Sequence, residues 1–180
     1  MKQKIILIGM KACGKTTVGK FLAKKLKIQI YEVDQEIENK HQKLKKEKLT
    51  FREIFKKYGK DYFRNLETSV LENLAEKLKN RSYILSCGGG TVLSENNQKI
   101  IRKMGTIIFL NTDKKILLDR IAKDGIPTFF PDQDDPARSL NILMKERLPV
   151  YKKLANIIIN IKNETLKEIV NKILEGIYEN

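Results

Sequence analysis

Residues 9–16 read Gly-Met-Lys-Ala-Cys-Gly-Lys-Thr, which is the spacing G-x-x-x-x-G-K-[ST] of a phosphate-binding loop. The apolar run at residues 5–8 precedes this loop, and a helical pattern with Val18, Leu22 and Leu26 follows it. A buried strand that leads through a glycine-rich turn into a helix leaves several backbone N–H groups pointing into one hollow. Those donors and the helix dipole favour a bound phosphate. The stretch therefore predicts a nucleotide site, with a ligand-free glycine turn as the alternative.

The same loop supplies the predicted nucleotide contacts. Lys15 is expected to reach the β- and γ-phosphates and to act in catalysis, and the Thr16 hydroxyl is expected to hold Mg²⁺. ATP and Mg²⁺ are therefore the predicted cofactors. The predicted contacts within the loop are Gly9, Met10, Lys11, Ala12, Cys13, Gly14, Lys15, Thr16 and Thr17.

Length and composition indicate one globular domain over residues 1–180. Of these 180 residues, 41% are hydrophobic and 32% are charged, and no apolar run is long enough to cross a bilayer. A first strand that begins near Lys4 leaves no room for a signal peptide ahead of it. We therefore expect a cytoplasmic protein in which Cys13 and Cys87 are free thiols.

Five short apolar runs predict five strands, at residues 4–8, 28–31, 83–86, 106–110 and 157–161. Helical patterns fill the intervals between these runs. Strands that alternate with helices form a parallel sheet covered on both faces, an α/β fold with three layers. Ligands of such sheets bind beyond the carboxyl ends of the strands, so the residues just after each strand are the candidates for chemistry.

Polar or glycine-rich segments follow the second and third strands. Glu32 and Asp34 come after the second strand, where one carboxylate could orient the water shell of Mg²⁺ and the other could contact an acceptor hydroxyl. Asp34 could equally cap the helix that follows it. After the third strand, three consecutive glycines, Gly88 to Gly90, would let a ligand approach the backbone closely. A flexible turn is the alternative for these glycines.

Further candidates lie in helices and in one irregular segment. The proline-containing stretch 123–137 predicts a lid that excludes water during phosphoryl transfer. Arg64 and Arg147 could each bind a carboxylate in bidentate fashion, or could simply be ion-paired at the surface. His41, the single histidine, lies in the lysine-rich stretch 40–60 and is expected to be solvated rather than catalytic.

The net charge of +14 leaves two classes of partner open. A basic surface can bind nucleic acid, and it can also attract a small anionic substrate. Lysines interleaved along helices usually only solvate a face, and no aromatic-rich strand typical of RNA binding is present. We therefore expect ATP and a small molecule as partners, no nucleic acid, no membrane contact and a monomer. A nucleic-acid-associated protein, whose binding would weaken steeply with salt, is the competing class.

Taken together, these segments resemble the shikimate kinase family of the nucleoside-monophosphate-kinase-like P-loop group. The segments that carry the resemblance are 9–17, 32–38, 63–67, 88–90 and 147–151. The resemblance implies transfer of the ATP γ-phosphate to the 3-hydroxyl of shikimate, in the biosynthesis of chorismate and aromatic amino acids. It also implies the strand order 2-3-1-4-5, an acceptor-binding subdomain at about residues 34–67 and a lid at about residues 123–137.

The resemblance further implies roles for individual residues. Asp34 would bind shikimate hydroxyls and act as the base, while Arg64 and Arg147 would hold the shikimate carboxylate. Residues 88–90, that is Gly88, Gly89 and Gly90, would line the acceptor pocket with backbone donors. Arg120 would pack on the adenine ring.

The chain departs from the family pattern in three places. Glu32 stands where the family usually has aspartate, although its longer carboxylate still reaches Mg²⁺ through water. Lys60-Asp61 replaces a Gly-Glu pair, and residues 125–130 read Gly-Ile-Pro-Thr-Phe-Phe where the family lid has Arg-Pro-Leu-Leu. Arg138 or Lys123 are the candidates to replace the lid arginine at the nucleotide. The alternatives are a kinase for another hydroxy acid such as gluconate, a kinase for a nucleoside monophosphate, and an ATP-binding module without turnover.

Overall fold

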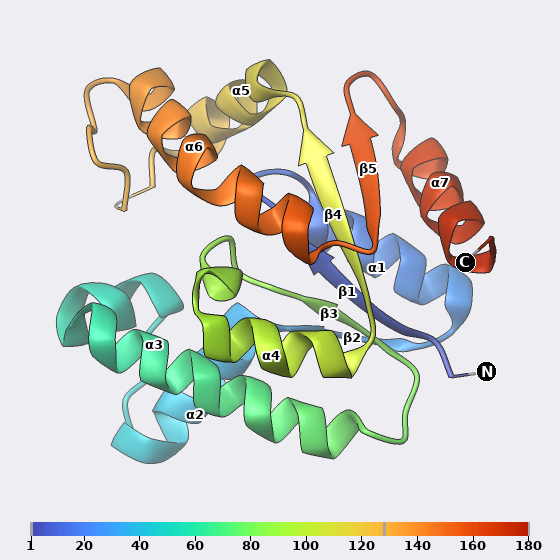
Figure 1. The fold of residues 1–180 in the computed structure, drawn as a ribbon. Helices are drawn as coiled ribbons and strands as arrows, with labels where there is room; N and C mark the ends of the chain where they lie inside the picture. The colour runs from blue at the N-terminus through green and yellow to red at the C-terminus, as the bar shows by residue number, and fades with distance from the viewer. Residues whose placement is uncertain (1, 128, 180) are drawn as a thin grey trace.

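The computed structural model describes residues 2–127 and 129–179 and contains a parallel sheet in the order β2-β3-β1-β4-β5 (Figure 1). This order is the one that the resemblance predicts. The strands are β1 (Lys4–Ile8), β2 (Gln29–Glu32), β3 (Tyr83–Ser86), β4 (Thr106–Thr112) and β5 (Ile157–Ile161). Three of them, β1, β3 and β5, have the bounds that their apolar runs predict, whereas β2 is shifted by one residue and β4 continues two residues further.

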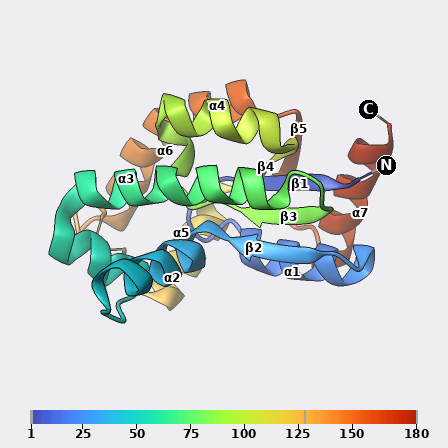
Figure 2. The same cartoon turned by 90° about the horizontal axis from the view of Figure 1, so that it is seen from below.

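Helices cover both faces of the sheet (Figure 2). One face carries α1 (Lys15–Leu26) and α7 (Leu166–Tyr178), and the other carries α3 (Phe51–Leu78), α4 (Glu95–Met104) and α6 (Pro136–Leu154). The remaining elements lie toward the carboxyl ends of the strands: α2 (Val33–Lys45), the short 3-10 turn η1 (Thr91–Leu93) and α5 (Lys114–Asp124). The predicted three-layer α/β architecture is therefore confirmed.

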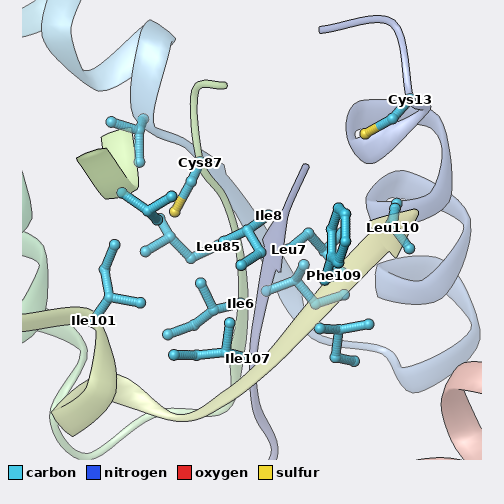
Figure 3. Packing of buried hydrophobic residues seen from close by; sticks show 14 of the residues in the cluster. Ile6, Leu7, Ile8, Cys13, Leu85, Cys87, Ile101, Ile107, Phe109 and Leu110 are labelled. Carbon is cyan, nitrogen blue, oxygen red and sulfur yellow. The ribbon is translucent and has the colours of Figure 1, made fainter. Parts of the chain in front are cut away.

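Side chains of the central strands pack into the buried hydrophobic core (Figure 3). Ile6, Leu7 and Ile8 of β1 are fully buried, and they lie in register with β4, where Leu7 pairs with Ile108 and Ile8 with Phe109. Burial of each such side chain contributes about 1.5–3 kcal/mol. Because this core is rigid, the loops that leave the carboxyl ends of its strands have fixed starting points.

Gly59 divides α3 into two helical segments. Its backbone has φ 82° and ψ 173°, a conformation that L residues rarely adopt, so the helix axis changes direction there. A capping box between Thr50 and Glu53 starts the first segment, and the Phe51 N–H donates to Glu38 Oε1 of α2 at 2.9 Å. The first segment therefore packs on α2, apart from the sheet.

His41 is buried, and the expectation that it is solvated is wrong. Its ring is fully inaccessible to solvent, with Nδ1 2.9 Å from the Tyr62 hydroxyl and Nε2 3.4 Å from Glu47 Oε2. The ring also packs edge-on against Tyr58. The lysine-rich sequence around His41 hides this arrangement because its partners come from the other side of the turn and from α3. His41 thus fastens α2 to α3.

The irregular segment between α5 and α6 is shorter than the predicted lid. The helices extend to Asp124 and begin again at Pro136, so residues 125–135 connect them, and Thr128 lies outside the described residues. The Asp135 side chain accepts from the Arg138 N–H at 2.8 Å and thereby caps α6. Cys13 and Cys87 are both free, as expected. Within the described ranges, no helix combines the length and the apolar character that a membrane span needs.

Candidate active site

The turn between β1 and α1 has the backbone geometry that its sequence predicts. Gly9 and Gly14 have φ values of 146° and 97°, and a Cβ on Gly9 would lie 2.8 Å from both Cys13 Sγ and the Leu110 carbonyl. Only glycine fits there. Ala12 adopts the left-handed region with φ 64°, and its carbonyl accepts from Arg120 Nη1 at 3.0 Å. The left-handed residues therefore curve the loop, and the contact with Arg120 helps to hold it in this form. The loop leads directly into the first turn of α1.

Lys15 and Thr16 stand at the start of α1. Lys15 Nζ donates to the carbonyls of Gly9 at 3.0 Å and Met10 at 2.8 Å, so the ammonium group lies across the mouth of the loop. The Thr16 hydroxyl donates to Glu32 Oε2 at 3.0 Å. A hydroxyl beside a carboxylate is a hard oxygen pair of the kind that Mg²⁺ prefers. Among the described residues no group of three or more His, Cys, Asp or Glu side chains that could hold a metal ion occurs.

Asp34 lies in the first turn of α2 and does not cap that helix. The N-cap position is Glu32, so the capping alternative for Asp34 is wrong. Burial raises the pKa of Asp34 to about 6, while the positive charge of Lys15 opposes this rise. At neutral pH the carboxylate is therefore still mostly ionised but binds a proton more readily than an ordinary aspartate, which suits a group that accepts a proton during the reaction.

The backbone of the glycine turn after β3 lies close to three of the predicted site side chains. A Cβ on Gly88 would lie 2.8 Å from Asp34 Oδ1, and one on Gly89 would lie 3.4 Å from both Arg147 Nη1 and the Lys11 nitrogen. A Cβ on Gly90 would overlap the Arg64 guanidinium. None of these glycines has a positive φ, so they are needed for space rather than for backbone conformation.

A buried carboxylate fixes Arg64 on its helix. Arg64 Nη1 donates to Glu67 Oε2 at 2.5 Å, and Glu67 is only 1% exposed. The other oxygen of Glu67 accepts from Thr91 Oγ1 at 2.7 Å, and Asn97 Nδ2 donates to the Thr91 carbonyl at 2.9 Å. Glu67 is thus a positioning residue, for which the sequence predicted no role beyond its place in the segment 63–67 that carries the family resemblance. The guanidinium of Arg64 keeps its remaining donors for a ligand.

Arg147 projects from α6 and is 8% exposed. Its Nε is buried without a hydrogen-bond partner, and its guanidinium carbon lies 5.7 Å from the centre of the Phe129 ring. The hydroxyl of Tyr151, one turn further along α6, donates to the Gly89 carbonyl at 2.5 Å. A buried, unpartnered guanidinium donor beside the glycine turn is suited to bind a carboxylate.

These groups surround one cavity of about 870 Å³. The predicted site residues that line it are Lys11, Ala12, Cys13, Gly14, Lys15, Thr16, Thr17, Glu32, Asp34, Arg64, Gly88, Gly89, Gly90, Arg120 and Arg147. Gly9 and Met10, at the start of the loop, do not line the cavity but contribute the carbonyls that accept from Lys15 Nζ. Arg138 does not line the cavity, and its guanidinium lies 3.7 Å from Asp132 with the side chain 70% exposed.

Comparison with known proteins shows which family this arrangement belongs to. The model of the family described as "SKI: Shikimate kinase" matches residues 11–178. The chain belongs to the shikimate kinase family. A shikimate kinase of Bartonella henselae is 34% identical over 96% of this chain and 77% of that protein.

Solved structures agree with this membership of the shikimate kinase family. The structure described as shikimate kinase from Acinetobacter baumannii in complex with shikimate superposes with a TM-score of 0.87 and 30% identity, covering 100% of this chain and 95% of that one. A gluconokinase from Sinorhizobium meliloti gives a TM-score of 0.60 at 17% identity, with 98% and 92% coverage, and shares the fold alone. The gluconate-type alternative is therefore not favoured for this member of the shikimate kinase family.

Proposed function

We propose that this chain transfers the γ-phosphate of ATP to the 3-hydroxyl of shikimate, giving 3-phosphoshikimate and ADP. Its membership of the shikimate kinase family makes it an ATP-dependent kinase. The observation that carries the substrate assignment is the glycine turn at residues 88–90, which places one carboxylate and two guanidinium groups side by side opposite the phosphate-binding loop. A substrate with a hydroxyl at one end and a carboxylate at the other matches that arrangement.

Each group has a distinct task in the proposed reaction. Arg64 and Arg147 bind the shikimate carboxylate, and this contact turns the hydroxyl toward the γ-phosphate. Asp34 accepts the proton of the hydroxyl as its oxygen forms the new bond to phosphorus. The bond between the γ-phosphorus and the bridging oxygen breaks, and its electron pair leaves with ADP. Lys15 neutralises charge on the β- and γ-phosphates.

Mg²⁺ is proposed as the metal, with Thr16 as a direct ligand and Glu32 as an acceptor for metal-bound water. When bound, the ion would neutralise charge on the phosphates. Arg120 is proposed to pack on the adenine ring, since it lines the same cavity and donates to the Ala12 carbonyl of the loop. Residues 34–67 are proposed as an acceptor-binding subdomain, residues 123–137 as a lid, and the chain as a cytoplasmic monomer.

An acceptor panel tests the substrate assignment. Release of ADP would be followed by a coupled assay with shikimate, gluconate or AMP as acceptor, and with no acceptor as the control for simple hydrolysis. We expect ADP release that depends on shikimate. Turnover of gluconate or AMP without turnover of shikimate would reject the assignment.

A further inference from the structure

The cavity needs more positive charge at the transferred phosphate than Lys15 alone provides. Phosphoryl transfer spreads negative charge over the γ-phosphate oxygens, and kinases neutralise it with a metal ion and more than one cationic side chain. Of the described residues of the stretch 123–137, those that line the cavity are Asp124 and Phe129, and neither is basic. Arg138 does not line the cavity and contacts Asp132. The lid as described therefore brings no cation to this place.

Lys11 stands in the phosphate-binding loop itself, four residues before Lys15. Its Nζ is buried and has no hydrogen-bond partner, although the side chain lines the cavity. An ammonium group has three donors, and leaving all of them unsatisfied in a buried place is costly. The simplest reason for such an arrangement is an anionic ligand that completes it.

The backbone of Lys11 lies against the glycine turn, and charged groups that line the cavity act on its ammonium group. The Lys11 backbone nitrogen lies against Gly89, next to the turn that carries the acceptor groups. Burial and the charge of Arg52 lower the pKa of Lys11, while the carboxylates of Asp124 and Asp34 raise it. These carboxylates act on Lys11 through space, because its Nζ has no hydrogen bond to either of them. Lys11 thus lies within electrostatic reach of the proposed base and on the loop that holds ATP.

Phe129 connects this position to the lid. The centre of its ring lies 5.8 Å from Lys11 Nζ and 5.7 Å from the Arg147 guanidinium carbon. Contacts of this kind between a cation and an aromatic face are favourable and strengthen when water is excluded. The lid therefore covers the two cations with an aromatic ring instead of adding a cation of its own.

We propose that Lys11 donates to the γ-phosphate and stabilises the phosphoryl group in transit, so that this second cation comes from the phosphate-binding loop rather than from the lid. This proposal rests on the proposed function. Lys11 makes and breaks no covalent bond, and the proton of the acceptor still goes to Asp34. Removal of one such electrostatic contact typically lowers kcat by about 100- to 1000-fold.

Lys11→Met tests the proposal, since it keeps most of the length of the unbranched side chain and removes its charge. Lys11→Arg restores the charge, and Lys24→Met, at an exposed position of α1, is the matched control. We expect Lys11→Met to lower kcat about 100-fold, Lys11→Arg to recover activity to within about 10-fold of the unmodified protein, and Lys24→Met to leave kcat unchanged.

A binding measurement separates this role from a structural one and from failure of the proposed function. Calorimetry would give the dissociation constants of MgADP and of MgADP with aluminium fluoride, which mimics the phosphoryl group in transit. We expect Lys11→Met to bind MgADP normally and to lose the extra affinity for the fluoride complex, a readout that stands even if shikimate is not the acceptor. Equal loss of affinity for both ligands, an unchanged kcat, or a rise only in the KM for shikimate would overturn the proposal.

Discussion

The Thr16 hydroxyl of α1 donates a hydrogen bond of 3.0 Å to Glu32 Oε2 at the end of β2. This bond joins the phosphate-binding loop to the segment that carries the proposed base. Lys20 Nζ lies 3.9 Å from the other Glu32 oxygen, but because its side chain is largely exposed this ion pair contributes little to the stability of the fold. The Thr16–Glu32 pair would therefore bring the proposed metal site next to the start of the proposed acceptor-binding subdomain.

Glu32→Gln is expected to weaken the use of Mg²⁺. The amide keeps the hydrogen bond from Thr16 but loses the charge that orients metal-bound water, and losses of this kind reduce metal affinity about 10- to 100-fold. The measurement is the Mg²⁺ concentration that gives half-maximal rate at fixed ATP. Glu36→Gln, in the first turn of the helix α2 that follows Glu32, serves as the control. An unchanged Mg²⁺ requirement would remove Glu32 from the metal site.

The rate should fall on the acid side with a midpoint near the pKa of Asp34. That pKa is raised to about 6 by burial, so the carboxylate takes up a proton, and loses its function as a base, as the pH drops through about 6. A profile of kcat/KM for shikimate from pH 5 to 8 reports this group in the free enzyme. A flat profile above pH 5 would contradict the assignment of Asp34 as the base.

Asp34→Asn should stabilise the fold at neutral pH while it nearly abolishes turnover. The folded-state pKa of Asp34 lies above its ordinary value of 3.8, so the charged form is disfavoured by folding. At pH 7 the change should raise the free energy of unfolding by about 1–2 kcal/mol, after allowance for partial solvent exposure. This advantage should shrink as the pH falls through about 6 toward 4, because the native carboxyl then protonates first. Urea unfolding of the unmodified protein and of Asp34→Asn at pH 7 and pH 4.5 measures this difference in stability, and MgATP affinity checks that the site is intact. If the two proteins were equally stable at both pH values, burial would not disfavour the charged form of Asp34.

Gly90→Ala should impair shikimate binding without loss of nucleotide binding. The new methyl group would overlap the Arg64 guanidinium, which must then leave its contact with Glu67 or push the turn aside. We expect the KM for shikimate to rise about 10-fold, as for a weakened charged hydrogen bond of about 1.4 kcal/mol. Arg64→Ala should have a similar or larger effect. Normal shikimate KM in both variants would show that Arg64 does not bind the acceptor.

The strands and the loop are the parts of this molecule that local sequence describes well. Apolar runs define β1 and β3 because almost every side chain of these strands is buried. The edge strand β5 is also marked by an apolar run, although Ile158 and Asn160 are exposed. β4 continues to Thr112, where Thr112 Oγ1 donates to the Cys13 carbonyl and Asn111 pairs with Asn160. Polar partners of this kind leave no hydrophobic pattern, so the run of apolar residues ends before the strand does.

The site was predictable in its types of residue but not in the way these are held. Asp34 and the glycine turn were predicted from their positions just after strands. The reason for three glycines is visible only in the fold, where they leave room for the side chains of Asp34, Arg147 and Arg64. Glu67 belongs to a segment that carries the family resemblance, but its positioning role was not predicted, because a glutamate on a helix is ordinarily solvated and two of its partners lie 24 and 30 residues away. For the same reason, sequence spacing alone did not show that His41 is buried.

Product analysis tests the central claim most directly. Purified protein would be incubated with MgATP and shikimate, and the products followed by ³¹P NMR. The account predicts one new phosphomonoester signal, coupled to the proton on carbon 3 of the shikimate ring, together with an equal amount of ADP. Loss of ATP to inorganic phosphate alone, or no consumption of ATP in the presence of shikimate, would contradict it.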